Sequence, residues 1–314
     1  MVFAAVTLTV RARPITDFPE MVVSVGSPYT VLIAVVGLVL ALWGRRTVLS
    51  IVAAIVVVVS LAIQVSWYYL GSTDGRALQA DRHTEIRVFA SNIFKGQADP
   101  EAFVRLATDN ADVITVAELT PDSVRGFRQA GLEQVFPYSH LLPSVGGGGI
   151  GMWSRYPLTA VSVPRHRAVV MPAARLSVPG VAIKPVLAST HVMSPVAGDE
   201  NTVADWGEGM AAAKAQLGNF AQAAGAGTVI VGGDYNSTPD MRQFRDLLTD
   251  GYRDAVEESG AGFAPTFPAD ASVPPLITID HVLTRNAVAK SVKVVSVPGS
   301  DHLGLVATIQ VPLD

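Results

Sequence analysis

The chain changes character near residue 70, from long apolar runs to short apolar runs separated by polar segments. Residues 22–43 are nearly uncharged, and residues 48–70 form a second uncharged run ending in the aromatic triplet Trp67-Tyr68-Tyr69. At about 1.5 Å per helical residue, runs of this length cross a hydrocarbon core of roughly 30 Å. An aromatic end is typical of a membrane interface. The pattern predicts two transmembrane helices over residues 22–70, and it disfavours the alternative of two buried soluble helices.

Residues 1–21 have no clear role in this pattern. The first ten are apolar but too short to span a bilayer, and they fit a remnant of a longer helix, a signal-like segment or an interfacial stretch. The turn between the two long runs carries Arg45 and Arg46. Cationic loops stay on the cytoplasmic side, so we expect everything after residue 70 to lie outside the membrane. Arg11 and Arg13 place positive charge on that same outer side, which weighs against this orientation.

Residues 71–84 are polar and predict a linker. Along residues 85–314, short apolar runs typical of strands alternate with segments whose apolar residues have helical spacing. This pattern indicates one compact α/β or α+β domain of about 230 residues. The expected helices cover 100–109, 121–130, 206–224 and 241–248. The expected strands cover 86–90, 113–117, 150–153, 158–163, 185–190, 229–231, 277–283, 292–297 and 304–311.

Composition narrows the chemistry. The chain is 49% hydrophobic and only 16% charged, and the apolar excess lies in its first seventy residues. A net charge of −4 argues against a large basic surface for tracking nucleic-acid backbones. The absence of cysteine excludes disulfides, thiolate catalysis and cysteine-ligated zinc.

Polar side chains that bind metals or move protons follow the ends of the expected strands. Asp234 and Asn236 come after the apolar run Val229–Val231 and the glycine pair at 232–233, which lets the backbone turn. Two residues apart on an extended chain, they would point to the same side, although an Asx turn is the plainer reading. The same placement recurs at Asn92, Glu118, His191, Asp280, Asp301 and His302.

Seven short blocks occur in a fixed order along this part of the chain: Ser91-Asn92, Ala117-Glu118, Trp153-Ser154-Arg155-Tyr156-Pro157, Thr190-His191, Gly233-Asp234-Tyr235-Asn236, Ile279-Asp280-His281 and Ser300-Asp301-His302. Together with Thr266-Phe267-Pro268, they resemble the endonuclease/exonuclease/phosphatase superfamily, which includes DNase I-like nucleases, neutral sphingomyelinases and inositol-polyphosphate 5-phosphatases. The resemblance covers residue 86 to the C-terminus. It implies an α+β fold, a four-layer α/β/β/α sandwich.

The resemblance also implies roles for these residues in phosphate-ester hydrolysis. Glu118 would be the principal ligand of Mg²⁺, or alternatively Mn²⁺, with Asn92 beside it and Asp301 nearby. Asp234 would orient or deprotonate the attacking water, and Asn236 would hold that water or a phosphate oxygen. His302 would be the general base or acid, with Asp280 fixing its tautomer, and His191 would donate to a phosphate oxygen.

Some positions depart from the family pattern. Ala117 stands where many relatives have Gln, which removes an amide near Glu118. No carboxylate partner for His191 is evident, and His281 should point away from Asp280 on a strand and serve a structural purpose.

The sequence favours a membrane-anchored, Mg²⁺-dependent phosphoesterase held by two helices, with its catalytic domain facing outward. Its expected substrate is a lipid headgroup or a cell-envelope phosphodiester. An extracytoplasmic metal-dependent nuclease, with nucleic acid as partner, is the second hypothesis. A catalytically silent scaffold is the third.

Overall fold

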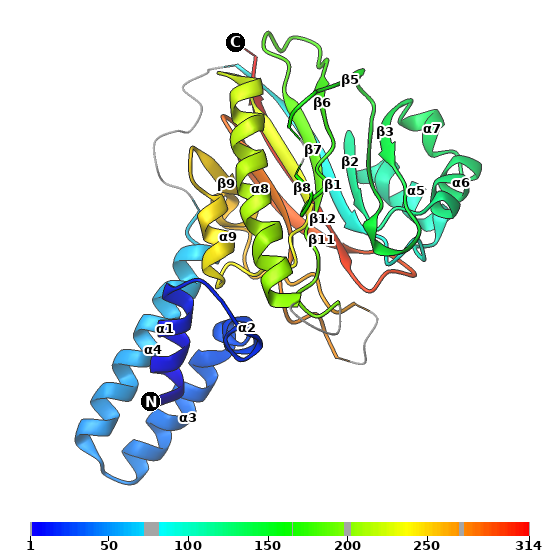
Figure 1. Ribbon diagram of the computed structural model, residues 1–314. Helices are drawn as coiled ribbons and strands as arrows, with labels where there is room; N and C mark the ends of the chain where they lie inside the picture. Colours follow the sequence, from blue (N-terminus) through cyan, green and yellow to red (C-terminus); the bar gives the residue numbers. More distant parts are fainter. Residues whose placement is uncertain (1, 72–81, 165, 198–201, 270–272, 314) are drawn as a thin grey trace.

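The computed structural model describes residues 2–71, 82–164, 166–197, 202–269 and 273–313. Most of the expected linker at 71–84 lies outside these residues. Figure 1 shows a slender group of helices below a larger domain of sheets and helices. The helices are α1 (Val2–Ala12), α2 (Phe18–Val25), η1 (Ser27–Tyr29), α3 (Thr30–Trp43), α4 (Thr47–Tyr68), α5 (Pro100–Asn110), α6 (Pro121–Gln129), α7 (Leu132–Val135), η2 (Gly146–Gly148), α8 (Thr202–Ala224), α9 (Arg242–Leu247) and α10 (Ala255–Ser259).

Two six-stranded sheets form the centre of the larger domain. The first has the order β11-β12-β1-β2-β4-β3, and the second has the order β5-β6-β7-β8-β10-β9. Neighbouring strands are antiparallel except for the parallel pairs β1–β2 and β7–β8. The strands are β1 (His83–Asn92), β2 (Val113–Ala117), β3 (Tyr138–Leu142), β4 (Ile150–Ser154), β5 (Leu158–Ala160), β6 (Ala173–Leu176), β7 (Val186–His191), β8 (Val229–Asp234), β9 (Tyr252–Asp254), β10 (Asp280–Arg285), β11 (Val288–Ser296) and β12 (Leu303–Pro312).

The sheets pack face to face, with helices on both outer faces (Figure 1). Alternate residues of the central strands, such as Val88, Ile230 and Val282, fill the space between the sheets. Phe103 and Phe127 stack with ring centroids 4.4 Å apart where α5 and α6 cover the first sheet. A separate apolar cluster lies where α8 covers the second sheet. The expected four-layer α+β sandwich is therefore confirmed.

Several strand boundaries differ from the sequence expectation. The apolar pattern misses β3, β6 and β9, which are short and, in the case of β3, mostly unburied. The glycines at 232 and 233 lie inside β8 and do not form a turn. Close packing explains them, because a Cβ on Gly232 would lie 2.5 Å from Thr115 Oγ1 of the opposite sheet. A Cβ on Gly233 would lie 2.0 Å from the carbonyl oxygen of Thr190 in the neighbouring strand.

Among the residues that the structure describes, one helix, α4, is long and apolar enough to cross a membrane. The expected first span over 22–43 is not a straight helix, because α2 and the following helical segment meet at an angle of 48°. Gly26 and Pro28 lie at this break, where proline cannot continue the hydrogen-bond ladder. Arg45 and Arg46 occupy the tight turn between α3 and α4.

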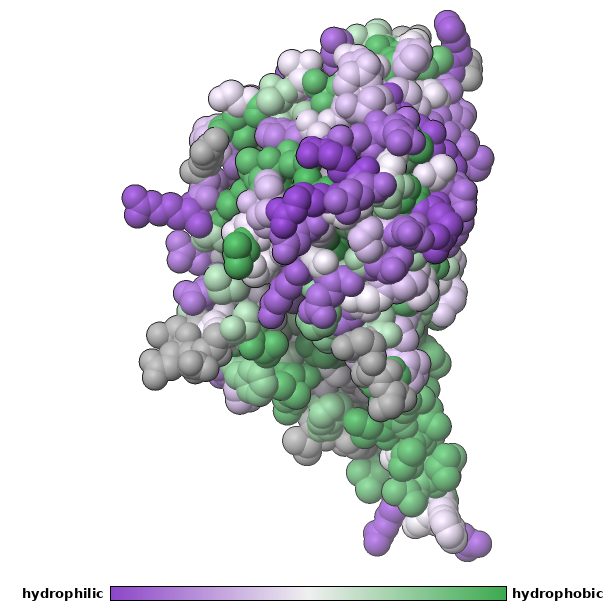
Figure 2. Space-filling view, turned by 90° about the vertical axis from the view of Figure 1, so that its right-hand side faces the viewer, coloured by the Kyte–Doolittle hydropathy of each residue, from purple (hydrophilic) through white to green (hydrophobic). Residues whose placement is uncertain are grey.

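The exposed apolar surface of these helices argues against two buried soluble helices. Only 17% of the apolar window of α4 is buried, and Leu32 and Val36 of α3 are about 60% exposed, at 61% and 59%. Figure 2 shows hydrophobic residues over the helical part of the molecule, with hydrophilic residues over the larger domain and at the far tip of the helices. Apolar surface of this extent marks an interaction site for membrane or protein.

The N-terminal segment is attached to the larger domain. Arg11 forms an ion pair with Asp240, with Nε and Oδ1 2.9 Å apart, and both side chains are largely buried. Gln243 exchanges two hydrogen bonds with the backbone of Ile15, and Ser27 Oγ lies 3.2 Å from Asp240 Oδ1. The positive charge of Arg11 is thus neutralised by a carboxylate of the larger domain.

Arg11→Ala is expected to destabilise the protein by about 3 kcal/mol, because it leaves the buried Asp240 carboxylate without its cation. Burial already raises the pKa of Asp240, although Arg11 counteracts this. The thermal unfolding midpoint in detergent should fall by several degrees, roughly 2 °C per kcal/mol. Adding Asp240→Asn to Arg11→Ala should recover part of the loss. Equal losses in the single and double variants would show that the pair does not hold the segment in place.

Candidate active site

The eight residues expected at the site gather at one edge of the two sheets. Asn92 and Asp234 end their strands, and Glu118 follows β2 directly. Because β10 and β12 run antiparallel to β8 and β1, their beginnings reach this same edge, which brings in Asp280, Asp301 and His302. The structure therefore brings together residues that are more than 200 positions apart in the sequence.

Asn92 connects the two sheets at this edge. Its Nδ2 donates to Asp234 Oδ2 at 3.0 Å and to Glu118 Oε1 at 3.3 Å, while its Oδ1 accepts the backbone N–H of Phe94. Glu118 Oε2 accepts the backbone N–H of Lys95 at 2.7 Å. These contacts fix the direction of both carboxylates.

The backbone is strained at Glu118, which has a φ of 61°. A non-glycine residue in this left-handed region costs on the order of 1–3 kcal/mol, and such strain concentrates at functional sites. The strain turns the chain at the end of β2, directly before Leu119, which exchanges backbone hydrogen bonds with Gly149 and Ser144. The Glu118 carboxylate lies close to the glycine-rich loop, because a Cβ on Gly147 would be 3.6 Å from its Oε1.

Asp234 and Asn236 come together through an Asx turn. The backbone N–H of Asn236 donates to Asp234 Oδ1 at 2.7 Å, and Asn236 Nδ2 lies 3.2 Å from Asp234 Oδ2. Asn236 adopts a φ of 46°, so the chain is not extended here. The two interpretations of Asp234 and Asn236, an Asx turn and a pair of site residues, are therefore compatible. The Asx turn itself directs both side chains to the site.

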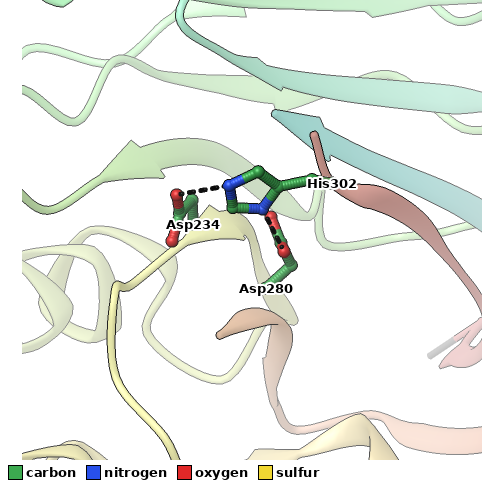
Figure 3. A group of neighbouring side chains, drawn as sticks. All are labelled: Asp234, Asp280 and His302. Atoms are coloured by element: carbon green, nitrogen blue, oxygen red, sulfur yellow. Dashed lines mark hydrogen bonds and ion pairs between the residues drawn. The ribbon is translucent and has the colours of Figure 1, made fainter. Parts of the chain in front are cut away.

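His302 lies between two carboxylates (Figure 3). Its Nδ1 is 2.8 Å from Asp280 Oδ2, and its Nε2 is 3.9 Å from Asp234 Oδ2 and 4.0 Å from Asp301 Oδ1. Because a carboxylate only accepts, Nδ1 carries the proton, which leaves Nε2 as the reactive nitrogen. Asp280 is fully buried and fixes both the tautomer and the ring orientation.

Burial opposes the charge on His302, but Asp280, Asp234 and Asp301 outweigh it and raise the pKa from 6.5 to about 10. Burial and the nearby Asp280 likewise raise the pKa of Asp234. The folded protein therefore holds the His302 proton more tightly than the unfolded chain does.

This shift predicts a pH dependence for metal-free protein. The stabilising contribution of the imidazolium should be complete below about pH 6.5 and should disappear as the pH rises toward about 10. In EDTA, the thermal unfolding midpoint is expected to fall across this window, and to fall less in His302→Asn. Identical pH profiles for the two proteins would contradict the prediction.

His191 contacts the glycine-rich loop. Its Nδ1 lies 2.9 Å from the carbonyl oxygen of Gly147, and its Nε2 lies 3.9 Å from Glu118 Oε1 and 3.7 Å from Asp234 Oδ2. The carbonyl only accepts, so Nδ1 carries a proton, and Nε2 donates only when the ring is an imidazolium. The orienting partner of His191 is thus a backbone carbonyl, which explains why no carboxylate for this purpose could be found in the sequence.

Residues to which the sequence analysis assigns no role stabilise the segments that carry the site residues. Thr266 Oγ1 accepts the backbone N–H groups of Ile279 and Asp280, and the Thr266 carbonyl accepts from Leu303, so this threonine joins the Asp280 and His302 segments. Trp206 Nε1 donates to the Asn236 carbonyl at 3.1 Å. His281 is structural, as expected, because its ring is buried between Asp254 and the Ser237 carbonyl.

A cavity of about 380 Å³ opens at this edge. Its polar lining includes Glu118, Asp234, Asn236, Asp301 and His302. Among the described lining residues there is no lysine or arginine, so carboxylates dominate the charge of the cavity.

This donor set fits a hard divalent cation. The carboxylate oxygens of Glu118, Asp234 and Asp301 around one cavity are the ligands that Mg²⁺ and Mn²⁺ prefer. Ligating atoms of Asp234, Asp280 and His302 also lie within 4.8 Å of one another. Without a cation, the excess of negative charge would repel any phosphate ester.

The sandwich and this acidic, histidine-containing cavity are typical of hydrolases that act on phosphate esters. The model of the Endonuclease/Exonuclease/phosphatase family matches residues 89–302, which is more than half of the chain. The chain therefore belongs to the Endonuclease/Exonuclease/phosphatase family. A comparison with curated proteins finds no match.

Solved structures share the fold at low sequence identity. Humanized D. rerio TDP2 is 17% identical, with a TM-score of 0.57 over 72% of this chain and 98% of that one. A 3′ phosphatase, NExo, from Neisseria, bound to a product DNA hairpin, is 16% identical, with a TM-score of 0.57 over 71% and 98%. Sphingomyelinase C from Streptomyces griseocarneus is 18% identical, with a TM-score of 0.54 over 72% and 99%.

Proposed function

We propose that this protein is a membrane-anchored, Mg²⁺-dependent phosphoesterase that hydrolyses a phosphodiester or phosphomonoester, with Mn²⁺ as an alternative metal. One observation carries the proposal: in a domain of this family, three carboxylates and an Asp280-oriented His302 line the same cavity. The similarity of this fold to that of sphingomyelinase C supports a lipid headgroup or an envelope phosphodiester as the substrate.

Glu118, Asn92 and Asp301 are the residues that would hold the metal. When bound, the cation supplies positive charge against the phosphoryl oxygens and the leaving oxygen. Asp234 and Asn236 orient the attacking water, because their side chains are fixed by the Asx turn and open into the cavity.

His302 and His191 contribute proton transfer and hydrogen bonding to the reaction. His302 exchanges a proton at Nε2, and its Nδ1–H stays with Asp280 throughout, so the ring cannot rotate away. His191, held at Nδ1 by the Gly147 carbonyl, directs its Nε2 toward a phosphate oxygen. Both rings belong to rigid strand ends, which favours the precise positioning that hydrolysis needs.

The membrane anchor is part of the proposal. α4 and the bent α2–α3 segment would provide two spans, with Arg45 and Arg46 on the cytoplasmic side and residues 85–314 outside. The exposed apolar surface of both helices supports this arrangement. A phosphatase reporter fused after Leu70 should then be active, whereas activity from a fusion at Arg45 with silence after Leu70 would reverse the orientation.

A metal-supplemented screen tests the activity. Purified full-length protein is expected to hydrolyse bis-p-nitrophenyl phosphate only with Mg²⁺ or Mn²⁺ present. Plasmid DNA and phospholipid vesicles, assayed side by side, separate the lipid proposal from an extracytoplasmic nuclease, which the DNA-bound Neisseria structure supports. A protein that is inert toward every ester and binds no Mg²⁺ would instead be a scaffold.

A further inference from the structure

One wall of the catalytic cavity comes from the N-terminal helix α2. Phe18, Met21, Val22 and Val25 line the same cavity as Glu118 and the other polar residues. Their spacing of three, four and seven residues places them on one face of the helix. Met21 is 3% exposed and packs into the core of the domain, whereas Phe18 and Val22 are 54% and 53% exposed.

This wall is held in a fixed position relative to the site. Asp17 caps the start of α2 by accepting the N–H of Glu20, and Ile15 is bound to Gln243 on α9. Beyond the end of α2, Ser27 contacts the buried Asp240. Both ends of the helix are therefore tied to the segment that follows β8, which carries Asp234.

The lining of the cavity combines apolar side chains with the polar site residues. Val196, Phe267 and Ile277 add further apolar side chains to this lining. Phe267 packs against His302, with ring centroids 4.9 Å apart. A substrate that fills the cavity must therefore carry an apolar group directly beside its phosphate. A polynucleotide would bring further phosphates, which the described lining has no lysine or arginine to bind.

The helix α2 that lines the cavity connects directly to the helices that would contact the membrane. α2 leads through the 48° bend into α3, whose Leu32 and Val36 are exposed. A short helix with one apolar face, next to a span, is suited to lie in the membrane interface. An apolar chain could thus pass from the bilayer along α2 to the site without crossing water.

Resting on the proposed phosphoesterase activity, we propose that the substrate is a membrane lipid phosphate ester, whose apolar chain lies against Phe18 and Val22 of α2 while its phosphoryl group reaches Glu118 and His302. α2 is then a specificity element of the active site as well as part of the anchor. The hydrolysed bond joins phosphorus to an ester oxygen: water adds its hydroxyl to phosphorus, and its proton leaves with the alcohol.

The test is a series of p-nitrophenyl alkyl phosphodiesters, from methyl to butyl, with full-length protein in nanodiscs. Each added methylene buried against α2 should raise kcat/KM about fourfold. The double variant Phe18→Ser with Val22→Ser should lose most of this increase, so that its kcat/KM changes little from the methyl to the butyl ester. Val36→Ser, an equally exposed position on α3 that does not line the cavity, should retain the full increase.

The outcomes separate this inference from the proposed function. A wild-type enzyme that cleaves every ester at the same rate, or that prefers plasmid DNA, would overturn the lipid inference and leave the phosphoesterase intact. If no ester is cleaved, the proposed function fails. Calorimetry then decides the inference: dodecyl phosphate should bind at least tenfold tighter than inorganic phosphate, and equal binding by the Phe18→Ser, Val22→Ser variant would overturn it.

Discussion

His302→Asn is expected to lower kcat for bis-p-nitrophenyl phosphate about 10³-fold, since a positioned proton-transfer group contributes roughly 10²–10⁴. The asparagine amide can still donate to Asp280 but cannot exchange a proton at the position of Nε2. KM should change little, because His302 acts on the reacting proton more than on substrate binding. Steady-state kinetics at saturating Mg²⁺ provide the measurement.

His83→Asn is the matched control, because His83 is an exposed histidine at the far end of β1. It should retain wild-type kcat. Asp280→Asn should also lower kcat while leaving the fold in place, since the amide can donate to Nδ1 and stabilise the wrong tautomer. Wild-type activity in His302→Asn would remove this residue from the mechanism and leave the proton transfer to another group.

Glu118→Gln should lower kcat/KM about 10³-fold at physiological Mg²⁺, because it removes one of the charges that hold the cation while preserving side-chain size. Raising the Mg²⁺ concentration should recover part of the activity, which a purely structural defect would not allow. EDTA should abolish wild-type activity, and added Mg²⁺ or Mn²⁺ should restore it. Calorimetric titration of Mg²⁺ should show weaker binding by the variant.

Glu101→Gln serves as the control for the loss of a carboxylate, since Glu101 is a highly exposed residue at the start of α5. Its activity and Mg²⁺ affinity should match the wild type. An active Glu118→Gln with unchanged Mg²⁺ affinity would show that the metal is held elsewhere, for which the Asp234, Asp280 and His302 cluster is the alternative place.

The family resemblance carried by the ordered blocks predicts the sandwich and the convergence of the eight site residues, whereas the apolar pattern alone indicates only an α/β or α+β domain. The blocks that carry site residues lie at or beside strand ends, and the pairing of β1, β7, β8, β10 and β12 brings those ends to a common edge. The block Trp153–Pro157 lies at the other edge, because Ser154 at the end of β4 pairs with Val113 at the start of β2. The short strands β6 and β9 could not be predicted, because three or four residues are too few to show the alternation of apolar and polar residues that marks a strand. The partner of His191 escaped because it is a backbone carbonyl, which every residue possesses.

The contribution of α2 to the site could not be predicted either. Its apolar face resembles that of any membrane segment, and the run over 22–43 hides the bend at Gly26 and Pro28. Only the tertiary structure shows that this face lines the cavity of the site residues. The role of each site residue remains a prediction that the variants above will test.

The attachment of α2 has a practical consequence for biochemists who would study the soluble portion by itself. A fragment that begins after α4 would keep all the carboxylate and histidine residues of the site. Its cavity would, however, lack the wall that Phe18 and Val22 form in the full-length protein. Such a fragment should accept bulky water-soluble esters that the intact protein excludes. Selectivity recorded on it would then describe the trimmed enzyme and not the one at the bilayer.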